Sequence, residues 1–234
     1  MTLKEIQKRL EALKKKGFVP SRRRGPTGIG HTLEQELQLE ETNIAVPDIG
    51  GRVELKANRR DASSLITLFT FNRGVWQISQ KEVIEKYGYV DDNGRKALYN
   101  TIYVDRENSQ GLTLSIIKED NQVKLIHKAS GEVVAVWSIY TIVGKFISKL
   151  ERAIFVFAQS RKNEEGNEEF YFDEAYLLEQ PLPDKFMEAF AKSIIAIDIR
   201  MYIKDSGAVR NHGTGIRIFE KDIPQLYGKK RELI

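Results

Sequence analysis

Residues 47–56 read Pro-Asp-Ile-Gly-Gly-Arg-Val-Glu-Leu-Lys, and this stretch decides which fold we expect. Its two glycines predict a turn, and residues 52–57 predict a short strand after the turn. Because side chains alternate between the two faces of a strand, Glu54 and Lys56 are expected on one face, about 7 Å apart. The turn brings Asp48 back toward the same edge. Two carboxylates and one ammonium group are therefore predicted to meet there.

Such a cluster suits a hard divalent cation at a phosphate ester. Magnesium prefers oxygen ligands and usually takes only one or two carboxylates together with a phosphate oxygen. Asp48 and Glu54 would bind the cation, which polarises the scissile phosphate and lowers the pKa of an attacking water. Lys56 would orient that water and offset the charge that gathers on phosphorus. The alternative is a solvated strand face on which Glu54 and Lys56 form a weak ion pair.

Composition excludes several other kinds of protein. The chain has 234 residues and a net charge of +4, which favours polyanionic partners only weakly. The absence of cysteine excludes disulfide frameworks and thiolate zinc sites, and three histidines make a multi-histidine zinc site improbable. No signal-peptide core and no apolar run of about 20 residues is present. We therefore expect a soluble, cytoplasmic protein with no membrane partner.

The rest of the chain alternates between helical and extended patterns. Leucine and isoleucine recur at three- and four-residue steps from Leu3 to Leu13, which predicts an amphipathic opening helix. The mixture of apolar strands and interleaved helices favours an α/β core with added antiparallel pieces. Further helices are expected at residues 31–41, 80–87, 139–150 and 185–194, strands at 65–71, 153–158, 195–204 and 213–219, and an antiparallel meander at 112–137.

Four motifs in this order resemble the MvaI/BcnI family of type II restriction endonucleases, which is itself similar to the mismatch-repair nicking enzyme MutH. They are Thr-Gly-Ile-Gly-His-Thr-Leu-Glu at 27–34, Pro-Asp and Val-Glu-Leu-Lys within 47–56, and Ser-Leu-Ile-Thr-Leu-Phe-Thr at 64–70. The resemblance resumes with Asp-Ile-Arg at 198–200 and His-Gly-Thr-Gly-Ile-Arg at 212–217. It is thin across residues 75–150.

The resemblance implies a PD-(D/E)XK restriction-endonuclease-like fold, in which a mixed sheet is flanked by helices. A catalytic lobe is expected at residues 1–180, with the meander around 98–138, and a smaller C-terminal DNA-recognition lobe at 181–234. By the same resemblance Asp48 and Glu54 are metal ligands and Lys56 is the catalytic lysine. Glu34 matches the family's helix glutamate, which supports the active site; the sequence alone favours an exposed helix carboxylate.

The polar face of the predicted strand 195–204 is the candidate surface for base recognition. Its apolar side chains alternate with a polar face, for which the simplest interpretation is contact with water. Arginine pairs bidentately with guanine and aspartate accepts from cytosine, so Asp198 and Arg200 suit a site that contains G·C pairs. Lys204 and Arg210 are candidates for phosphate binding. The full set of candidates, with those the resemblance adds, is Asp198, Arg200, Tyr202, Lys204, Arg210, His212 and Arg217.

The basic loop between the first two helices is a second DNA-binding candidate. Its small residues let backbone amides approach phosphates, and its arginines neutralise them. A solvated basic loop is the equal alternative when the residues are considered without the resemblance. His31 is expected at most to position other groups, and His127 is expected to be structural. The candidates in this segment are Arg22, Arg23, Arg24, Thr27, Gly28, Gly30 and His31.

These features together predict a type II restriction endonuclease that cuts double-stranded DNA at a short site. We expect a monomer that uses one or two Mg²⁺ ions per active site and leaves 5′-phosphate ends. The host would need a cognate DNA methyltransferase for protection. Two alternatives remain: a MutH-like enzyme that nicks one strand, and a sequence-specific DNA-binding protein without catalysis.

Overall fold

The computed structural model describes residues 2–39, 49, 51, 53–60, 64–71 and 74–234, which form two compact units. The first unit comprises Met1–Ser64, Ile147–Leu182 and Pro224–Ile234, and the second comprises Leu65–Phe146 and Pro183–Ile223. The chain passes between them several times, once within helix α4 (Ile139–Leu150). Each unit is discontinuous in sequence, because strands distant in sequence pair within it. The assignment of a catalytic lobe to residues 1–180 and a recognition lobe to residues 181–234 stays a prediction.

The first unit is built on a five-stranded sheet with the order β1-β10-β9-β2, in which β13 also pairs with β10. Strand β2 pairs with β9 in parallel, and the other pairs are antiparallel. Because β2 ends the order, it is an edge strand. The strands are β1 (Val19–Pro20), β2 (Glu54–Arg59), β9 (Arg152–Lys162), β10 (Glu168–Pro181) and β13 (Tyr227–Glu232).

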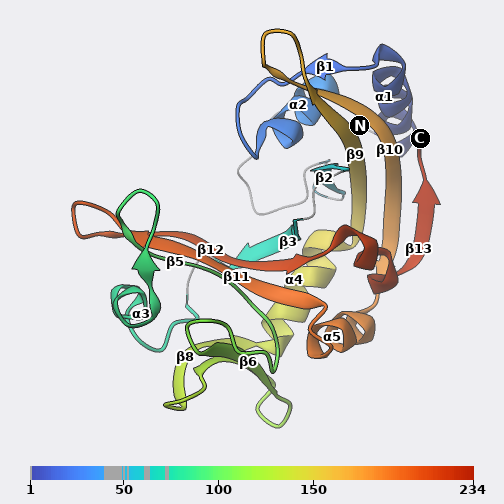
Figure 1. The fold of residues 1–234 in the computed structure, drawn as a ribbon. Helices are drawn as coiled ribbons and strands as arrows, with labels where there is room; N and C mark the ends of the chain where they lie inside the picture. The colour runs from blue at the N-terminus through green and yellow to red at the C-terminus, as the bar shows by residue number, and fades with distance from the viewer. Residues whose placement is uncertain (1, 40–48, 50, 52, 61–63, 72–73) are drawn as a thin grey trace. The chain divides into compact units, whose positions relative to one another are not determined.

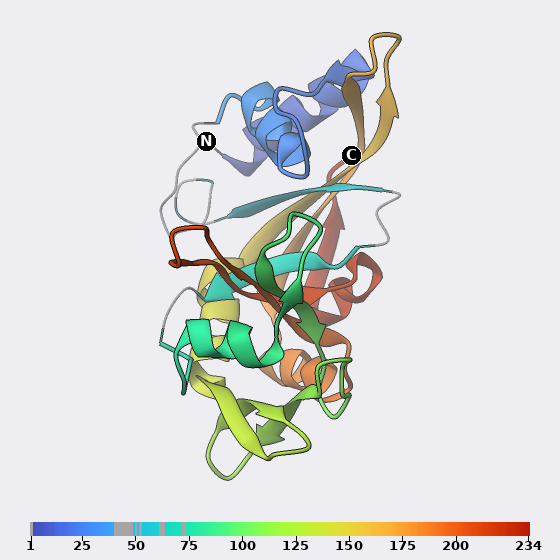
Figure 2. The same ribbon diagram turned by 60° about the vertical axis from the view of Figure 1, so that its left-hand side comes forward.

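Helices α1 (Leu3–Lys16) and α2 (Gly28–Glu36) pack against this sheet. Figures 1 and 2 both show the two helices side by side. A capping box between Thr2 and Glu5 begins α1, which buries the predicted apolar stripe. Leu10 and Leu33 share one core with alternate residues of β9 and β10. The helices therefore hold β2, whose Leu55 belongs to the same core.

The second unit contains two antiparallel sheets. One has the order β3-β12-β11-β5-β4 and the other the order β6-β7-β8. Helix α3 (Gln80–Tyr87) contacts β5 and β11, and α5 (Pro183–Ala191) contacts β11. The strands are β3 (Ile66–Phe71), β4 (Tyr89–Val90), β5 (Lys96–Ile102), β6 (Leu112–Ile117), β7 (Gln122–His127), β8 (Glu132–Ser138), β11 (Ile195–Ile203) and β12 (Val209–Ile218).

Most predicted elements are present, and a few boundaries differ. The meander is the β6-β7-β8 sheet, and helix α2 begins at Gly28 rather than at residue 31. Strands β1, β4, β10 and β13 were not predicted, and β5, which overlaps the meander expected around 98–138, pairs with β11 in the other sheet. Among the described residues, no helix is long and apolar enough to cross a membrane.

Candidate active site

Glu54 and Lys56 lie at the start of edge strand β2, on one face as their spacing predicts. Lys56 Nζ is 2.5 Å from Glu54 Oε1. Only 1% of Glu54 is exposed, whereas the Lys56 side chain is 22% exposed. The pair is therefore not a solvated surface pair, because its carboxylate has been removed from water.

The two oxygens of Glu54 have different surroundings. Oε2 is buried and has no hydrogen-bond partner among the residues that the structure describes. Oε1 faces two ammonium groups, since Lys149 Nζ lies 3.4 Å from it in addition to Lys56. Burial, together with the charge of Glu54, raises the pKa of Tyr227 on β13. A buried carboxylate oxygen without a donor is costly unless a ligand satisfies it, so this oxygen is the strongest indication of a cation site.

The other two predicted catalytic residues are placed less completely. Asp48 lies outside the described residues. Glu34 is half-buried on α2, the helix that packs against β2. Its predicted role at the active site is compatible with that packing and stays a prediction.

In the second unit, Asp198 is the centre of a hydrogen-bonded cluster on β11. Only 5% of Asp198 is exposed. Its Oδ1 accepts from Thr101 Oγ1 at 2.8 Å, and its Oδ2 accepts from Arg200 Nε at 2.5 Å and Arg217 Nη1 at 3.1 Å. The predicted polar face thus exists, but its aspartate is buried beneath it.

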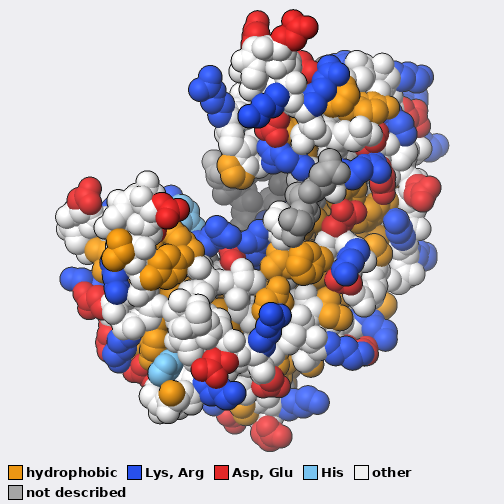
Figure 3. Space-filling view, in the orientation of Figure 1, with side chains coloured by type: hydrophobic (Ala, Val, Ile, Leu, Met, Phe, Trp, Pro, Cys, Tyr) orange, Lys and Arg blue, Asp and Glu red, His pale blue; other side chains and the backbone are white. Residues whose placement is uncertain are grey.

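The remaining candidates on this sheet surround the Asp198 cluster or extend from it. Arg200 is exposed, Arg217 is half-buried, and Lys204, Arg210 and His212 are exposed toward the β11–β12 turn. Figure 3 shows Lys and Arg side chains gathered over this part of the unit, with a histidine beside them. Partial burial of the ring is the main reason that the pKa of His212 lies below its usual value. The positive charges of Arg210 and Arg200 lower this pKa further. This surface carries positive charge without a positive histidine.

Tyr202 is held by a residue that the sequence did not indicate. The Arg95 guanidinium lies 4.0 Å from the centre of the Tyr202 ring and pairs with Asp91 at 2.7 Å. Tyr202 also lies near His212, with ring centres 6.2 Å apart. Arg95 therefore fixes the ring from the β4–β5 turn by a cation–π contact.

The basic loop of the first unit is fastened to α2. Arg22 donates its backbone N–H to Thr32 Oγ1 at 2.9 Å and pairs with Glu36 at 3.1 Å. Arg23, Arg24 and Thr27 are exposed. With the β9–β10 turn, the three arginines line a pocket of about 800 Å³. The loop thus presents its arginines on a fixed backbone, although Arg22 already has a carboxylate partner.

The small residues after the loop have unequal surroundings. Gly28 is buried, and a Cβ there would lie 2.3 Å from the carbonyl oxygen of Arg23. Gly30 has open space at the same position. His31 is half-buried on α2. Gly28 is therefore required for packing, and its contact with DNA stays a prediction, as do those of Gly30 and His31.

The sequence model of the MvaI/BcnI restriction endonuclease family matches residues 7–227. That range contains every candidate residue of both units. The chain belongs to the MvaI/BcnI restriction endonuclease family. As a member of that family it is a type II restriction endonuclease, which cuts DNA at specific sites.

Two solved structures share the fold of this family member. Over the whole of both chains, it is similar to the restriction endonuclease MvaI in complex with its cognate DNA substrate, with a TM-score of 0.82 and 22% identity. It also resembles MvaI in the absence of DNA, with a TM-score of 0.55 and 23% identity over 100% of this chain and 99% of that chain. The predicted α/β fold is thereby confirmed. No curated protein matches the chain by sequence.

Restriction endonucleases of this family generally use divalent metal ions, and Glu54 fits such an ion. Its Oε2 is a buried acceptor that the described residues leave without a donor. The described part of the chain has no group of three or more His, Cys, Asp or Glu side chains that could hold a metal ion. A site here would therefore depend on Glu54, with further ligands from substrate, water or Asp48.

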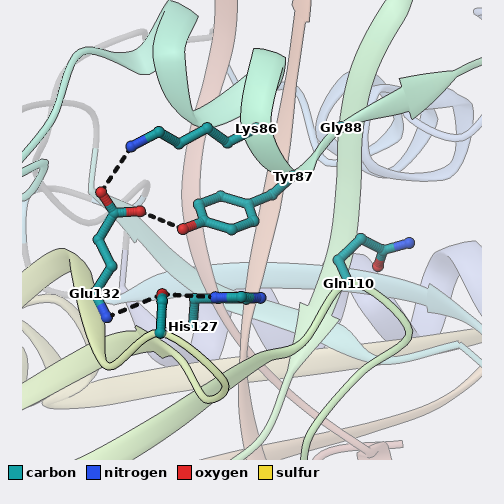
Figure 4. A pocket seen from close by; sticks show the side chains of 7 residues that line it. Lys86, Tyr87, Gly88, Gln110, His127 and Glu132 are labelled. Atoms are coloured by element: carbon teal, nitrogen blue, oxygen red, sulfur yellow. Dashed lines mark hydrogen bonds and ion pairs between the residues drawn. The ribbon is translucent and has the colours of Figure 1, made fainter.

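A separate polar pocket in the second unit lies between α3 and the β7–β8 turn (Figure 4). Glu132 accepts from Lys86 Nζ at 2.8 Å and from the Tyr87 hydroxyl. Burial and Glu132 raise the pKa of Tyr87 to about 12. His127 Nδ1 lies 2.8 Å from Ser130 Oγ, and its ring packs on Tyr87. These contacts join helix α3 to the β7–β8 turn, which agrees with a structural role for His127.

Proposed function

We propose that this restriction endonuclease hydrolyses phosphodiester bonds at a short specific site in double-stranded DNA, depends on Mg²⁺ and leaves 5′-phosphate ends. The observation that carries the proposal is the buried Glu54, whose Oε2 has no donor in the described structure while Oε1 faces Lys56. Such a carboxylate suits a hard cation next to an anionic substrate. Asp48 would be the second ligand, and one or two ions would bind at each active site.

The protein's own residues divide the remaining work. A bound cation would polarise the scissile phosphate and lower the pKa of the attacking water. Lys56 would hold that water in line and offset the negative charge that gathers on the phosphoryl oxygens. Glu34, on the helix behind β2, would support the site.

Recognition would be carried by the β11–β12 surface. Arg200 would present its exposed guanidinium group, of the kind that pairs bidentately with guanine. Arg217 is more constrained, because its Nη1 donates to Asp198 and its Nη2 donates to the Leu65 carbonyl oxygen; it would contribute its remaining N–H groups. The direct contact of Asp198 with cytosine is less favoured than the sequence implied, because three donors already occupy its carboxylate. Tyr202 and His212 would contact neighbouring bases. Lys204, Arg210 and the Arg22–Arg24 loop would hold phosphates.

The biological setting follows from this reaction. We propose that the enzyme acts as a monomer in the cytoplasm and cuts the two strands in separate events, through a nicked intermediate. An enzyme of this kind would also cut the DNA of its own host. A cognate methyltransferase that modifies the same site is therefore implied.

The test is cleavage of supercoiled plasmid and long phage DNA, with Mg²⁺ or with a chelator. The variant is Lys56→Ala, and Lys124→Ala is its matched control. Lys124 also lies on a strand, pairs with a carboxylate at 3.3 Å, and has 24% of its side chain exposed. Discrete fragments that need Mg²⁺, vanish in Lys56→Ala and persist in Lys124→Ala are expected. Stable nicked circles would favour the nickase, and metal-independent binding without cleavage would favour the binding protein.

A further inference from the structure

Lys149 is a second lysine at Glu54, and it comes from a different element from Lys56. It lies in the last turn of α4, just before β9. In the parallel pairing of β2 with β9, Glu54 is opposite Ala153. The residues that end α4 are thereby brought to the start of β2. This topology explains how a residue far along the chain places its ammonium group 3.4 Å from Glu54 Oε1.

Neutralisation of Glu54 requires only one of the two lysines. Lys56 already makes a hydrogen bond to Oε1 at 2.5 Å. At 3.4 Å, Lys149 lies beyond the usual hydrogen-bond distance and is attracted by charge alone. Within the described part of the chain it has this ion pair and no hydrogen bond. Its side chain is 25% exposed, and an ammonium group has three N–H donors to offer another acceptor.

The charge at this site favours an anion. The Glu54 carboxylate lies within 4 Å of two ammonium groups, those of Lys56 and Lys149. Asp48 would bring a second carboxylate, which the bound cation would more than offset. The C-terminal end of a helix also stabilises a positive charge, and Lys149 lies in the last turn of α4. An ammonium is a compact charge of the kind that binds phosphate oxygens.

We propose that Lys149 binds a non-bridging oxygen of the DNA phosphate at the active site, as a second catalytic lysine beside Lys56. The inference rests on the proposed function. Its ammonium lies 3.4 Å from Glu54 Oε1, and in the proposed role it contacts the phosphate when DNA is bound. There it compensates the negative charge that grows on the phosphoryl oxygens during hydrolysis.

The variant is Lys149→Met, which keeps the length and loses the charge, and Lys15→Met is the matched control. Lys15 is an exposed lysine in the last turn of α1. Affinity for a duplex that contains the mapped site is measured in chelator at several salt concentrations. Affinity falls as salt rises, and loss of one phosphate contact makes the slope of log affinity against log salt less steep by about 0.9. We expect that change, and a roughly 10²-fold lower single-turnover cleavage rate, in Lys149→Met only.

Two further variants keep the result decisive. Lys149→Arg retains charge and is expected to recover the salt slope and part of the rate. If Lys149→Met fails to fold, as judged by circular dichroism, Lys149→Gln is measured in the same way. A wild-type salt slope and rate in the folded uncharged variant would overturn the role of Lys149 and leave the proposed function intact. Failure of the wild-type protein to bind or cut DNA would overturn both.

Discussion

Arg200 donates a hydrogen bond through Nε to Oδ2 of Asp198, two residues before it on β11, at 2.5 Å. Arg217 donates to the same oxygen at 3.1 Å, and Thr101 donates to the other oxygen at 2.8 Å. A buried carboxylate with three donors has little capacity left for a base. We infer that Asp198 positions the two arginines, and we propose that their remaining N–H groups contact the base edges.

Asp198→Asn should therefore reduce discrimination between DNA sequences more than it reduces DNA binding itself. Both arginines donate to Oδ2. A neutral amide oxygen at that position accepts from them more weakly than the charged carboxylate does, so their guanidinium groups are held less firmly. We expect affinity for the cognate duplex to fall roughly 10- to 100-fold, the range for loss of one good base contact. Affinity for an unrelated duplex should change little. Fluorescence anisotropy with both duplexes, in chelator, measures the two affinities.

The control for this prediction is Asp205→Asn, which changes an exposed aspartate in the β11–β12 turn. That variant should retain the wild-type ratio of affinities. Equal ratios in wild type and Asp198→Asn would show that Asp198 does not position the arginines for recognition.

Gly28 and Gly30 provide a matched pair on α2. A Cβ at Gly28 would lie 2.3 Å from Arg23 O, which must move, whereas Gly30 has open space. Gly28→Ala should lower the free energy of unfolding by about 1–3 kcal/mol, as overpacking does. Gly30→Ala should raise it by up to about 1 kcal/mol, because alanine favours a helix. Urea unfolding of both variants tests the pair. Equal stabilities would contradict the close approach of loop and helix.

The sequence predicted the helices and the isolated apolar strands well. The apolar residues of the helices recur at regular three- and four-residue steps, and those of the strands form unbroken runs. Strand β10 escaped prediction for a physical reason. A bulge between Phe172 and Glu174 shifts its alternation, and several acidic residues interrupt it. Strand β13 carries mostly exposed charged residues at the sheet edge, where no apolar pattern is needed. The two discontinuous units could not be read from local patterns, since long-range pairing creates them.

The candidate site was predictable to a similar extent. The spacing of Glu54 and Lys56 predicted their contact, because strand periodicity alone sets it. Lys149, Arg95 and Thr101 carry no local signal, since only the pairing of distant strands brings them to their partners. The burial of Asp198 was also invisible to a pattern that alternates polar and apolar residues. Tertiary structure decides which polar residues of a strand meet solvent.

Glu54→Gln tests the cation site without depending on cleavage. The amide keeps the shape and removes the charge from the buried group whose Oε2 has no described partner. We expect affinity for Mn²⁺, followed by electron paramagnetic resonance, to fall at least about tenfold. Glu179→Gln is the control, since Glu179 is a strand carboxylate of the same unit paired with Arg152 at 2.7 Å. Equal Mn²⁺ affinity in all three proteins would exclude Glu54 as a ligand.

His212 should make the protein less stable in mild acid. In the folded protein, partial burial of the His212 ring lowers its pKa below the usual 6.5, and the charges of Arg210 and Arg200 lower it further. In the unfolded chain the pKa keeps its usual value. The unfolded chain therefore binds the proton more tightly. The contribution of neutral His212 to stability is complete above about pH 6.5 and declines as the pH falls toward the folded-state pKa.

His212→Asn removes the titrating group. The unfolding free energy of both proteins is measured from pH 8 to 5. Below about pH 6.5, the wild type should lose more stability than the variant does. A difference that is independent of pH, or a proton NMR titration that places the His212 pKa above 6.5, would contradict the prediction.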